Sequence, residues 1–160
     1  MVGTVGGYAQ DVDSTFLSNC NHFAMWGHAA AVDKGLKGVL QQHPTDMMLL
    51  MLGFNNIGWF YSNAPGTING IETLVSNAQA ANPNLKFTIA NVPQRSFISR
   101  RQDLVDNTVT YNSLLPGAIS KLTTEQSPIS LVELEENYDC QPGGCPAGYD
   151  SLFFLVPKDK

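Results

Sequence analysis

The sequence has few charged residues, and most of those few are acidic. Charged residues make up 14% of its 160 residues, and 9 Lys and Arg against 14 Asp and Glu give a formal net charge of −5. No basic run is longer than Arg100-Arg101, so the chain lacks the basic patch that nucleic-acid binding needs. No apolar run approaches the roughly 20 residues that a membrane-spanning helix requires. We therefore expect neither nucleic acid as a partner nor a membrane span.

Cysteine and histidine are also scarce, with 3 of each. Cys140 and Cys145 enclose a short loop whose Pro and Gly residues let the two Cα atoms approach bridging distance. We expect a disulfide there, which would indicate an oxidising compartment and a secreted full-length form; a pair of free thiols is the alternative. A zinc site needs more ligands than this segment offers, so we predict neither a metal nor a cofactor. No signal peptide is recognisable, because strand-like sequence follows Met1 directly.

The hydrophobic content of 43% suits one globular domain that spans residues 1–160. From about residue 29 the pattern alternates between helices and strands, as units of a parallel α/β sheet require. The expected helices are 32–41, 71–81 and 103–122, and the expected strands are 45–52, 87–92 and 130–134. Residues 59–70 are expected to form a loop, and Pro116 is expected to kink or break the last helix.

The most informative segment runs from Met47 to Asn56. Six apolar residues, Met47 to Leu52, are typical of a fully buried strand, and Gly53 then allows a sharp turn. The next residues place the side-chain amides of Asn55 and Asn56 at the carboxyl end of that strand, where open parallel sheets bind ligands. A fixed amide in that position can donate a hydrogen bond to a developing oxyanion.

Gly53-Phe54-Asn55-Asn56 resembles the Gly-x-Asn-Asp block of the SGNH (GDSL-type) ester hydrolases. The resemblance implies that Asn55 is an oxyanion donor, while Asn56 stands where the family usually has Asp. The family also has a glycine whose backbone N–H points into the oxyanion hole, and Gly27 is the best candidate for it. The alternatives are a turn-forming asparagine at position 55 and a helix-entry glycine at position 27.

The segment from Tyr149 to Phe153 resembles the Asp-x-x-His block that completes the family's catalytic site. Asp150 matches the triad acid, but Phe153 occupies the place of the catalytic histidine and cannot accept a proton. The nucleophile block, Gly-Asp-Ser-Leu or a variant, does not occur near the N-terminus, where the opening residues resemble the family's second strand. We therefore expect a truncated domain with impaired catalysis. His22, His28, His43, Ser96 and Ser151 are weak substitutes for the missing groups.

Trp59 and Phe60, followed by Tyr61, come shortly after the asparagine block. Such aromatic side chains can line a substrate cleft and stack on a sugar ring or an acyl group; packing beneath the loop is the alternative. With the resemblance, they imply a small-molecule or carbohydrate ester as substrate. Two other functions stay open: a non-catalytic relative that binds acylated sugars or glycans, and a gene fragment without function.

The resemblance also implies a fold: a flavodoxin-like, three-layer α/β/α sheet that lacks its first, interior strand. Each backbone group left unpaired and buried by that loss would cost roughly 1–3 kcal/mol. Domains are stable by only about 5–15 kcal/mol. We therefore expect a marginally stable monomer, or self-association through the strands left without a neighbour.

Overall fold

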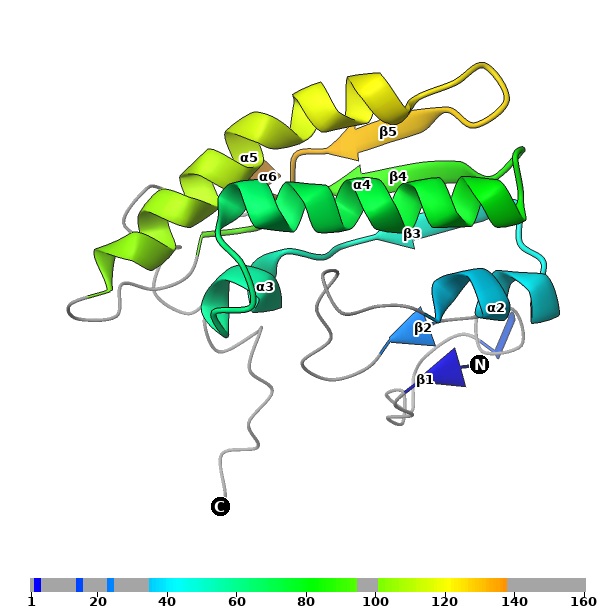
Figure 1. The fold of residues 1–160 in the computed structure, drawn as a ribbon, viewed down its shortest axis with the longest axis horizontal. Helices are drawn as coiled ribbons and strands as arrows, with labels where there is room; N and C mark the ends of the chain where they lie inside the picture. The colour runs from blue at the N-terminus through cyan, green and yellow to red at the C-terminus, as the bar shows by residue number, and fades with distance from the viewer. Residues whose placement is uncertain (1, 4–13, 16–22, 25–34, 95–100, 138–160) are drawn as a thin grey trace.

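The computed structural model describes residues 2–3, 14–15, 23–24, 35–94 and 101–137, and these alternate between strands and helices (Figure 1). The strands are β1 (Val2–Gly3), β2 (Phe23–Ala24), β3 (Met47–Leu50), β4 (Lys86–Ala90) and β5 (Ile129–Val132). The helices are α2 (Leu36–Gln42), α3 (Phe54–Gly58), α4 (Ala64–Ala81), α5 (Gln102–Leu122) and α6 (Leu134–Asn137). No described helix has both the length and the apolar character needed to cross a membrane.

The central feature is a three-stranded parallel sheet in the order β3-β4-β5. Thr88 of β4 pairs with Leu49 on one side and with Ser130 on the other. Strands β1 and β2 form a separate parallel pair. Because β3, β4 and β5 are parallel, their carboxyl ends meet at one edge, on the left of Figure 1, where α3 lies. The predicted α/β class with a parallel sheet is confirmed.

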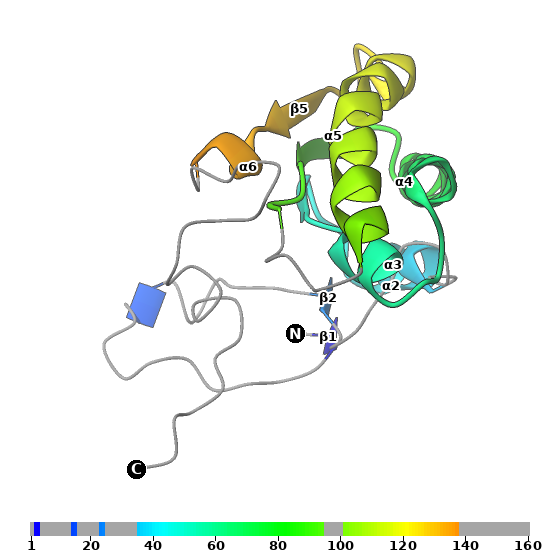
Figure 2. The ribbon, with the colours of Figure 1, turned by 90° about the vertical axis from the view of Figure 1, so that its left-hand side faces the viewer.

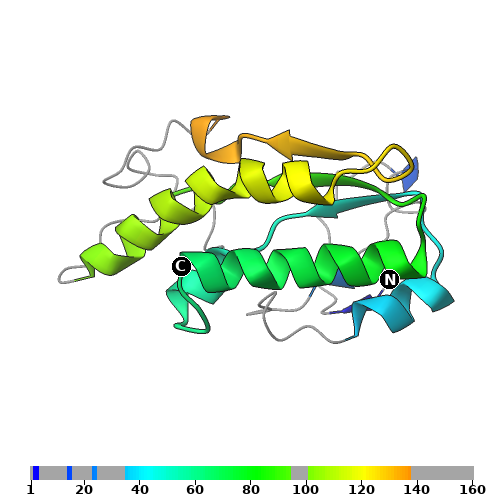
Figure 3. The same ribbon diagram turned by 45° about the horizontal axis from the view of Figure 1, so that its top comes forward.

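Helices α4 and α5 cover one face of the sheet, as Figure 2 shows, and lie side by side in Figure 3. The core lies between them and the sheet. Burying each large apolar side chain there contributes about 1.5–3 kcal/mol. The fully buried or nearly buried members include Leu50, Phe87 and Ile89 from the strands, and Ile71, Leu74, Val75, Tyr111 and Leu115 from the helices.

Strand β3 is an edge strand of this sheet, because within the described ranges it pairs only with β4. Its side chains alternate between the two faces of the sheet. Leu50 is buried toward the helices, whereas Met47, Leu49 and Met51 are 53%, 75% and 55% exposed. The prediction of a fully buried strand was therefore wrong, because only one face of β3 packs against the core. The missing interior strand stays a prediction.

Two further local predictions were wrong, namely a loop over residues 59–70 and a break of the last helix at Pro116. Helix α4 begins at Ala64, within the expected loop, because the Asn63 side chain caps it by accepting from the Gly66 N–H at 2.9 Å. Pro65 is tolerated in the first turn, where its missing N–H has no helical partner. Helix α5 continues through Pro116, because residues on both sides of the proline, such as Tyr111 and Ile119, are packed into the core.

Candidate functional site

The site is built on the turn that leads from β3 into α3. Gly53 caps α3 with a φ of 120°, a conformation that side chains rarely adopt. A Cβ on this residue would lie 3.0 Å from Tyr111 Cζ and 3.0 Å from Val92 Cγ2. Both backbone conformation and space therefore require glycine here. The turn places Asn55 and Asn56 in α3, at the carboxyl end of β3, as the sequence predicted.

Asn55 is half-buried and is held by Trp59, one helical turn later. The Trp59 backbone N–H donates to the Asn55 backbone oxygen at 2.9 Å. The indole Nε1–H donates to the Asn55 side-chain Oδ1 at 3.3 Å. The indole therefore bonds the carbonyl end of the Asn55 amide and not its NH₂ end. The role of Asn55 as an oxyanion donor stays a prediction.

Asn56 is completely buried and organises the turn after α3. Its backbone oxygen accepts from the N–H groups of Tyr61 at 3.0 Å and Ser62 at 3.3 Å. Phe60, directly before Tyr61, adopts a left-handed φ of 62°. Trp59 and Phe60 are 66% and 68% exposed, so they do not pack beneath the loop. Trp59 contacts Asn55, and Phe60 follows it in the chain, so both rings are open to a ligand near this turn.

Arg101, at the start of α5, lies over the Phe60 ring, with Cζ 4.1 Å from the ring centroid. Its Nε and an η-nitrogen each donate to a carboxylate oxygen of Asp103, both at 2.8 Å. Arg101 lowers the pKa of the exposed Asp103 carboxyl, chiefly through this hydrogen bonding. The paired guanidinium is thereby held against the aromatic ring, which is a favourable cation–π arrangement. The sequence pattern around Arg100-Arg101 gave no sign of this contact.

Two adjacent residues of α5 tie together the carboxyl ends of the strands. The Tyr111 hydroxyl donates to the Leu52 carbonyl at 3.0 Å, immediately before Gly53. Burial raises the pKa of Tyr111, so the phenol remains protonated and able to donate. Asn112 accepts from the Val92 N–H at 2.9 Å and donates to the Val92 oxygen at 2.8 Å. Sequence analysis did not identify either residue.

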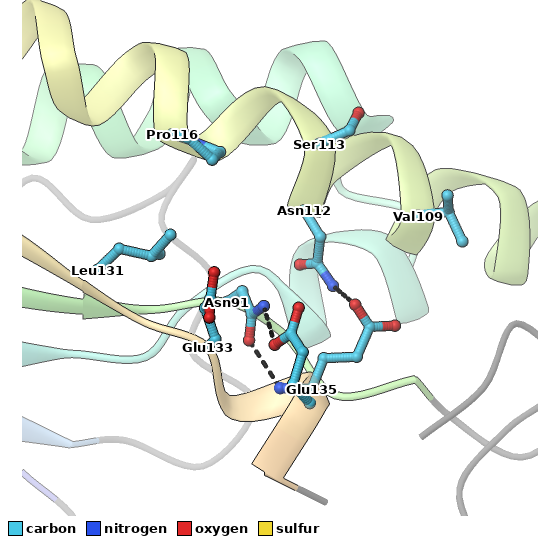
Figure 4. Close-up of a pocket in the computed structure, with 9 residues that line it drawn as sticks. Asn91, Val109, Asn112, Ser113, Pro116, Leu131, Glu133 and Glu135 are labelled. Carbon is cyan, nitrogen blue, oxygen red and sulfur yellow. Dashed lines mark hydrogen bonds between the residues drawn. The ribbon is translucent and has the colours of Figure 1, made fainter. Parts of the chain in front are cut away.

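Asn112 also donates to Glu135 at 2.7 Å, which joins α5 to the segment after β5 (Figure 4). Burial is the main cause that raises the pKa of the Glu135 carboxyl; Glu136 raises it further, and the bond from Asn112 opposes both. Asn91 donates to Glu136 and accepts from the Glu135 N–H. These residues line a cavity of about 430 Å³ together with Val109, Ser113, Pro116, Leu131 and Glu133.

This acidic cavity does not include Asn55, Trp59 or Phe60 among its lining residues. Within the described part of the chain, no group of three or more His, Cys, Asp and Glu side chains could hold a metal ion. The amides and carboxylates that line this cavity are hydrogen-bonded to one another. These bonds link the end of β4, α5 and α6. The candidate site is therefore placed at the Asn55 turn rather than here.

Several predicted residues lie outside the described ranges. Gly27, Asp150 and Phe153 are among them, as are Cys140 and Cys145, whose disulfide stays a prediction. His22, His28, Ser96 and Ser151 also lie outside. His43 is described: it follows α2, is exposed, and precedes β3, so it stands at the end of the strand opposite Asn55.

Comparison with known proteins gives structural likeness without a sequence match. No protein-family model matches the sequence, and no curated protein sequence matches it significantly. A carbohydrate esterase family 3 structure from Talaromyces cellulolyticus has a TM-score of 0.63 and 21% identity, over 79% of this chain and 62% of that one. An acetyl esterase variant crystallised with an acetate ion has a TM-score of 0.72 and 20% identity, over 95% of this chain and 74% of that one.

The chain thus spans less than two thirds of the length of the family 3 structure. At these identities the likeness shows the fold and nothing finer. The chain therefore shares the α/β fold of these two esterase structures.

Proposed function

We propose that this chain carries the site of an SGNH-type ester hydrolase that acts on a carbohydrate or small-molecule ester. The observation that supports it most is the Asn55 amide at the carboxyl end of β3, in an esterase-like fold, with its carbonyl end bound by Trp59. In a parallel sheet this edge is the place where ligands bind. An amide fixed beside the acyl group stabilises the negative charge that develops on its oxygen.

The proposed chemistry is acyl transfer through a serine. In the complete site of the family that the sequence resembles, a serine hydroxyl attacks the acyl carbon while a histidine accepts its proton, and the tetrahedral oxyanion accepts hydrogen bonds from the groups that the Asn55 amide and the Gly27 N–H match. The oxyanion then collapses, the alcohol leaves with the proton from histidine, and water releases the acid in a second round. Asp150 is proposed to orient the histidine. The sequence resemblance supports the roles of Gly27 and Asp150.

Trp59 and Phe60 are proposed to contact the substrate. Both rings are largely exposed, the Trp59 indole contacts Asn55, and aromatic faces stack well on the apolar faces of sugars. This pairing of an oxyanion donor with exposed aromatic rings favours an acylated carbohydrate over a small aliphatic ester. A secreted setting is proposed as well, supported by the pair Cys140 and Cys145 in the sequence.

The activity of the 160-residue chain itself is proposed to be impaired. Phe153 stands at the position of the general base, and phenylalanine cannot take the serine proton. The same observation favours a second candidate, a non-catalytic protein that binds acylated glycans through Trp59 and Phe60. The two candidates differ in whether Asn55 contributes to binding the acyl group.

The deciding experiment titrates the chain with an acetylated xylo-oligosaccharide in a calorimeter and assays hydrolysis of 4-nitrophenyl acetate. We expect saturable binding that weakens about tenfold in Asn55→Ala, the loss of one well-placed hydrogen bond, with hydrolysis near background. Binding that depends on Trp59 but not on Asn55 would favour the glycan-binding protein. Absence of both binding and turnover would contradict both functions. Robust turnover stopped by a serine-directed phosphonate would contradict the proposed impairment alone.

A further inference from the structure

We infer that Trp59 is a positioning residue: its indole N–H fixes which end of the Asn55 amide faces the acyl oxygen. The inference rests on the proposed function, since only an oxyanion donor needs its amide held one way round. It assigns the indole a task besides contact with the substrate.

An asparagine amide has a donor end and an acceptor end of nearly equal size. A half-turn about the Cβ–Cγ bond exchanges Nδ2 with Oδ1 and changes the shape very little. Only the NH₂ end can donate to an oxyanion. An Oδ1 in the same place would set one electron-rich oxygen against another, so the orientation of the amide decides whether Asn55 helps the reaction or opposes it.

The contact with Trp59 selects one of these orientations. The indole Nε1–H lies 3.3 Å from Asn55 Oδ1, and an indole can donate but cannot accept. It therefore bonds to Oδ1 and not to Nδ2. A hydrogen bond of ordinary net strength favours the observed orientation roughly two- to tenfold.

The backbone holds the indole in reach of the amide. Trp59 is the C-terminal cap of α3, and its main-chain N–H donates to the Asn55 oxygen at 2.9 Å. The chain then turns sharply at Phe60, and the bonds from Tyr61 and Ser62 to the Asn56 oxygen close the turn. The main chain is thus fixed on both sides of Trp59, so the indole needs little further ordering to reach Oδ1.

Packing does not account for a tryptophan at this position. The side chain is 66% exposed, so it contributes little to the core compared with buried aromatic residues such as Phe87. The polar atom of the ring is used for one bond, and that bond goes to the candidate oxyanion donor. A substrate contact alone would not require the N–H to point at Asn55.

The test replaces Trp59 in the full chain with β-(3-benzothienyl)alanine, which keeps the size of the ring but has sulfur in place of N–H. The same replacement is made in an Asn55→Ala background, which completes a double-mutant cycle. The affinity for sodium acetate is measured by NMR titration. In parallel, the Asn55 NH₂ resonances are followed in ¹⁵N spectra, assigned by their loss in Asn55→Asp.

We expect the isostere to weaken acetate binding two- to tenfold when Asn55 is present and to change nothing when it is absent. The Asn55 NH₂ resonances should shift, because Oδ1 of the same amide loses the hydrogen bond from the indole, and the melting temperature should stay the same. Equal effects of the isostere in both backgrounds, together with unchanged NH₂ resonances, would overturn the inference.

The spectroscopic readout separates this inference from the proposed function. If Asn55→Ala leaves acetate binding unchanged, the proposed role of Asn55 fails. The NH₂ resonances still decide the positioning role: a change in the isostere variant supports it, and unchanged resonances reject it.

Discussion

At the scale of single residues, two left-handed backbone conformations shape the site. Gly53 is a glycine for reasons of both conformation and space, since its φ is 120° and its neighbours Tyr111 and Val92 leave no room for a Cβ. Phe60 has a φ of 62° in spite of its side chain. Left-handed conformations cost non-glycine residues roughly 1–2 kcal/mol. Such strain often accompanies function, and here it occurs directly after Trp59, the residue that bonds the candidate oxyanion donor.

The strain at Phe60 can be measured with a matched pair of substitutions. Phe60→Ala and Phe60→Gly both remove the ring and its contact with Arg101, but only glycine also relieves the backbone. We expect Phe60→Gly to have the higher free energy of unfolding, by about 1 kcal/mol, in urea denaturation. In an ordinary helix alanine would be the more stable of the two. An alanine variant as stable as the glycine variant would show that Phe60 is not strained.

At the scale of elements, helix α5 serves as a clamp for the carboxyl edge of the sheet. Tyr111 holds the end of β3, and Asn112 holds the end of β4 and the segment after β5. Helix α5, which follows β4 in the sequence, therefore positions the carboxyl edge of the sheet where Asn55 lies. Gln94, four residues after β4, is itself buried and donates to the Val105 oxygen.

Removing the Asn112 amide tests this clamp. Asn112→Ala loses the bonds to Val92 N–H, Val92 oxygen and Glu135, at about 0.5–1.5 kcal/mol each, so we expect a loss of roughly 2–4 kcal/mol in urea unfolding. The matched control is Ser113→Ala, because that hydroxyl donates only within α5, to the Thr110 oxygen. The control should change stability by less than about 0.5 kcal/mol. Equal effects of the two variants would contradict the clamp.

The partner of Asn112, Glu135, makes the clamp sensitive to pH. Its pKa is raised in the folded state, so the folded protein holds this proton more tightly than the unfolded chain does. The stability that protonated Glu135 contributes is therefore fully present below the pKa that Glu135 has in the unfolded chain. It is lost as the pH rises through the pKa that Glu135 has in the folded protein. Glu133, Glu136, Asn91 and Asn112 share its surroundings.

Glu135→Gln should remove this pH dependence. Glutamine keeps an oxygen that can accept from Asn112, but it does not titrate. We expect the melting temperature of the variant relative to the wild type to rise as the pH increases from about 4 to 7, the range above the ordinary glutamate pKa. A constant difference between the two proteins across this range would show that Glu135 does not titrate abnormally.

At the scale of the whole molecule, β3 is an edge strand with apolar residues exposed on one face. Met47, Leu49 and Met51 alternate along that face, and the strand pairs only with β4 in the described sheet. Open edges of this kind pair with other chains unless charge or proline protects them. This geometry supports the proposal that the chain self-associates through β3.

Leu49→Lys should weaken that association and leave the stability of the monomer nearly unchanged, because Leu49 is 75% exposed. We expect light scattering to show a larger mass for the wild type at high concentration, and a monomer for the variant. Leu114→Lys is the control: Leu114 is 41% exposed on α5, on the other side of the sheet, and should leave the larger mass unchanged. A wild-type chain that stays monomeric at every concentration would contradict the proposal.

The sequence by itself determined the features that are local in the chain. The apolar run before Gly53 predicted a strand with Asn55 at its carboxyl end, because strand length and a turn residue are set over a few neighbouring positions. The alternation of helices and strands predicted the parallel sheet in the same way. The start of α4 and the continuity of α5 were misjudged, because a distant core and a side-chain cap outweighed the usual behaviour of proline.

Only the tertiary structure decided how the carboxyl edge is held. The bond from Tyr111 to Leu52 joins residues 59 positions apart, and those from Asn112 to Val92 and Glu135 span 20 and 23 positions. No local pattern specifies such pairs, because they form only when α5 packs against the sheet. The bond from Trp59 to Asn55 spans four positions, but it also depends on the conformation of the turn at Phe60. The sequence could place the asparagine, and the fold fixed which way its amide is bound.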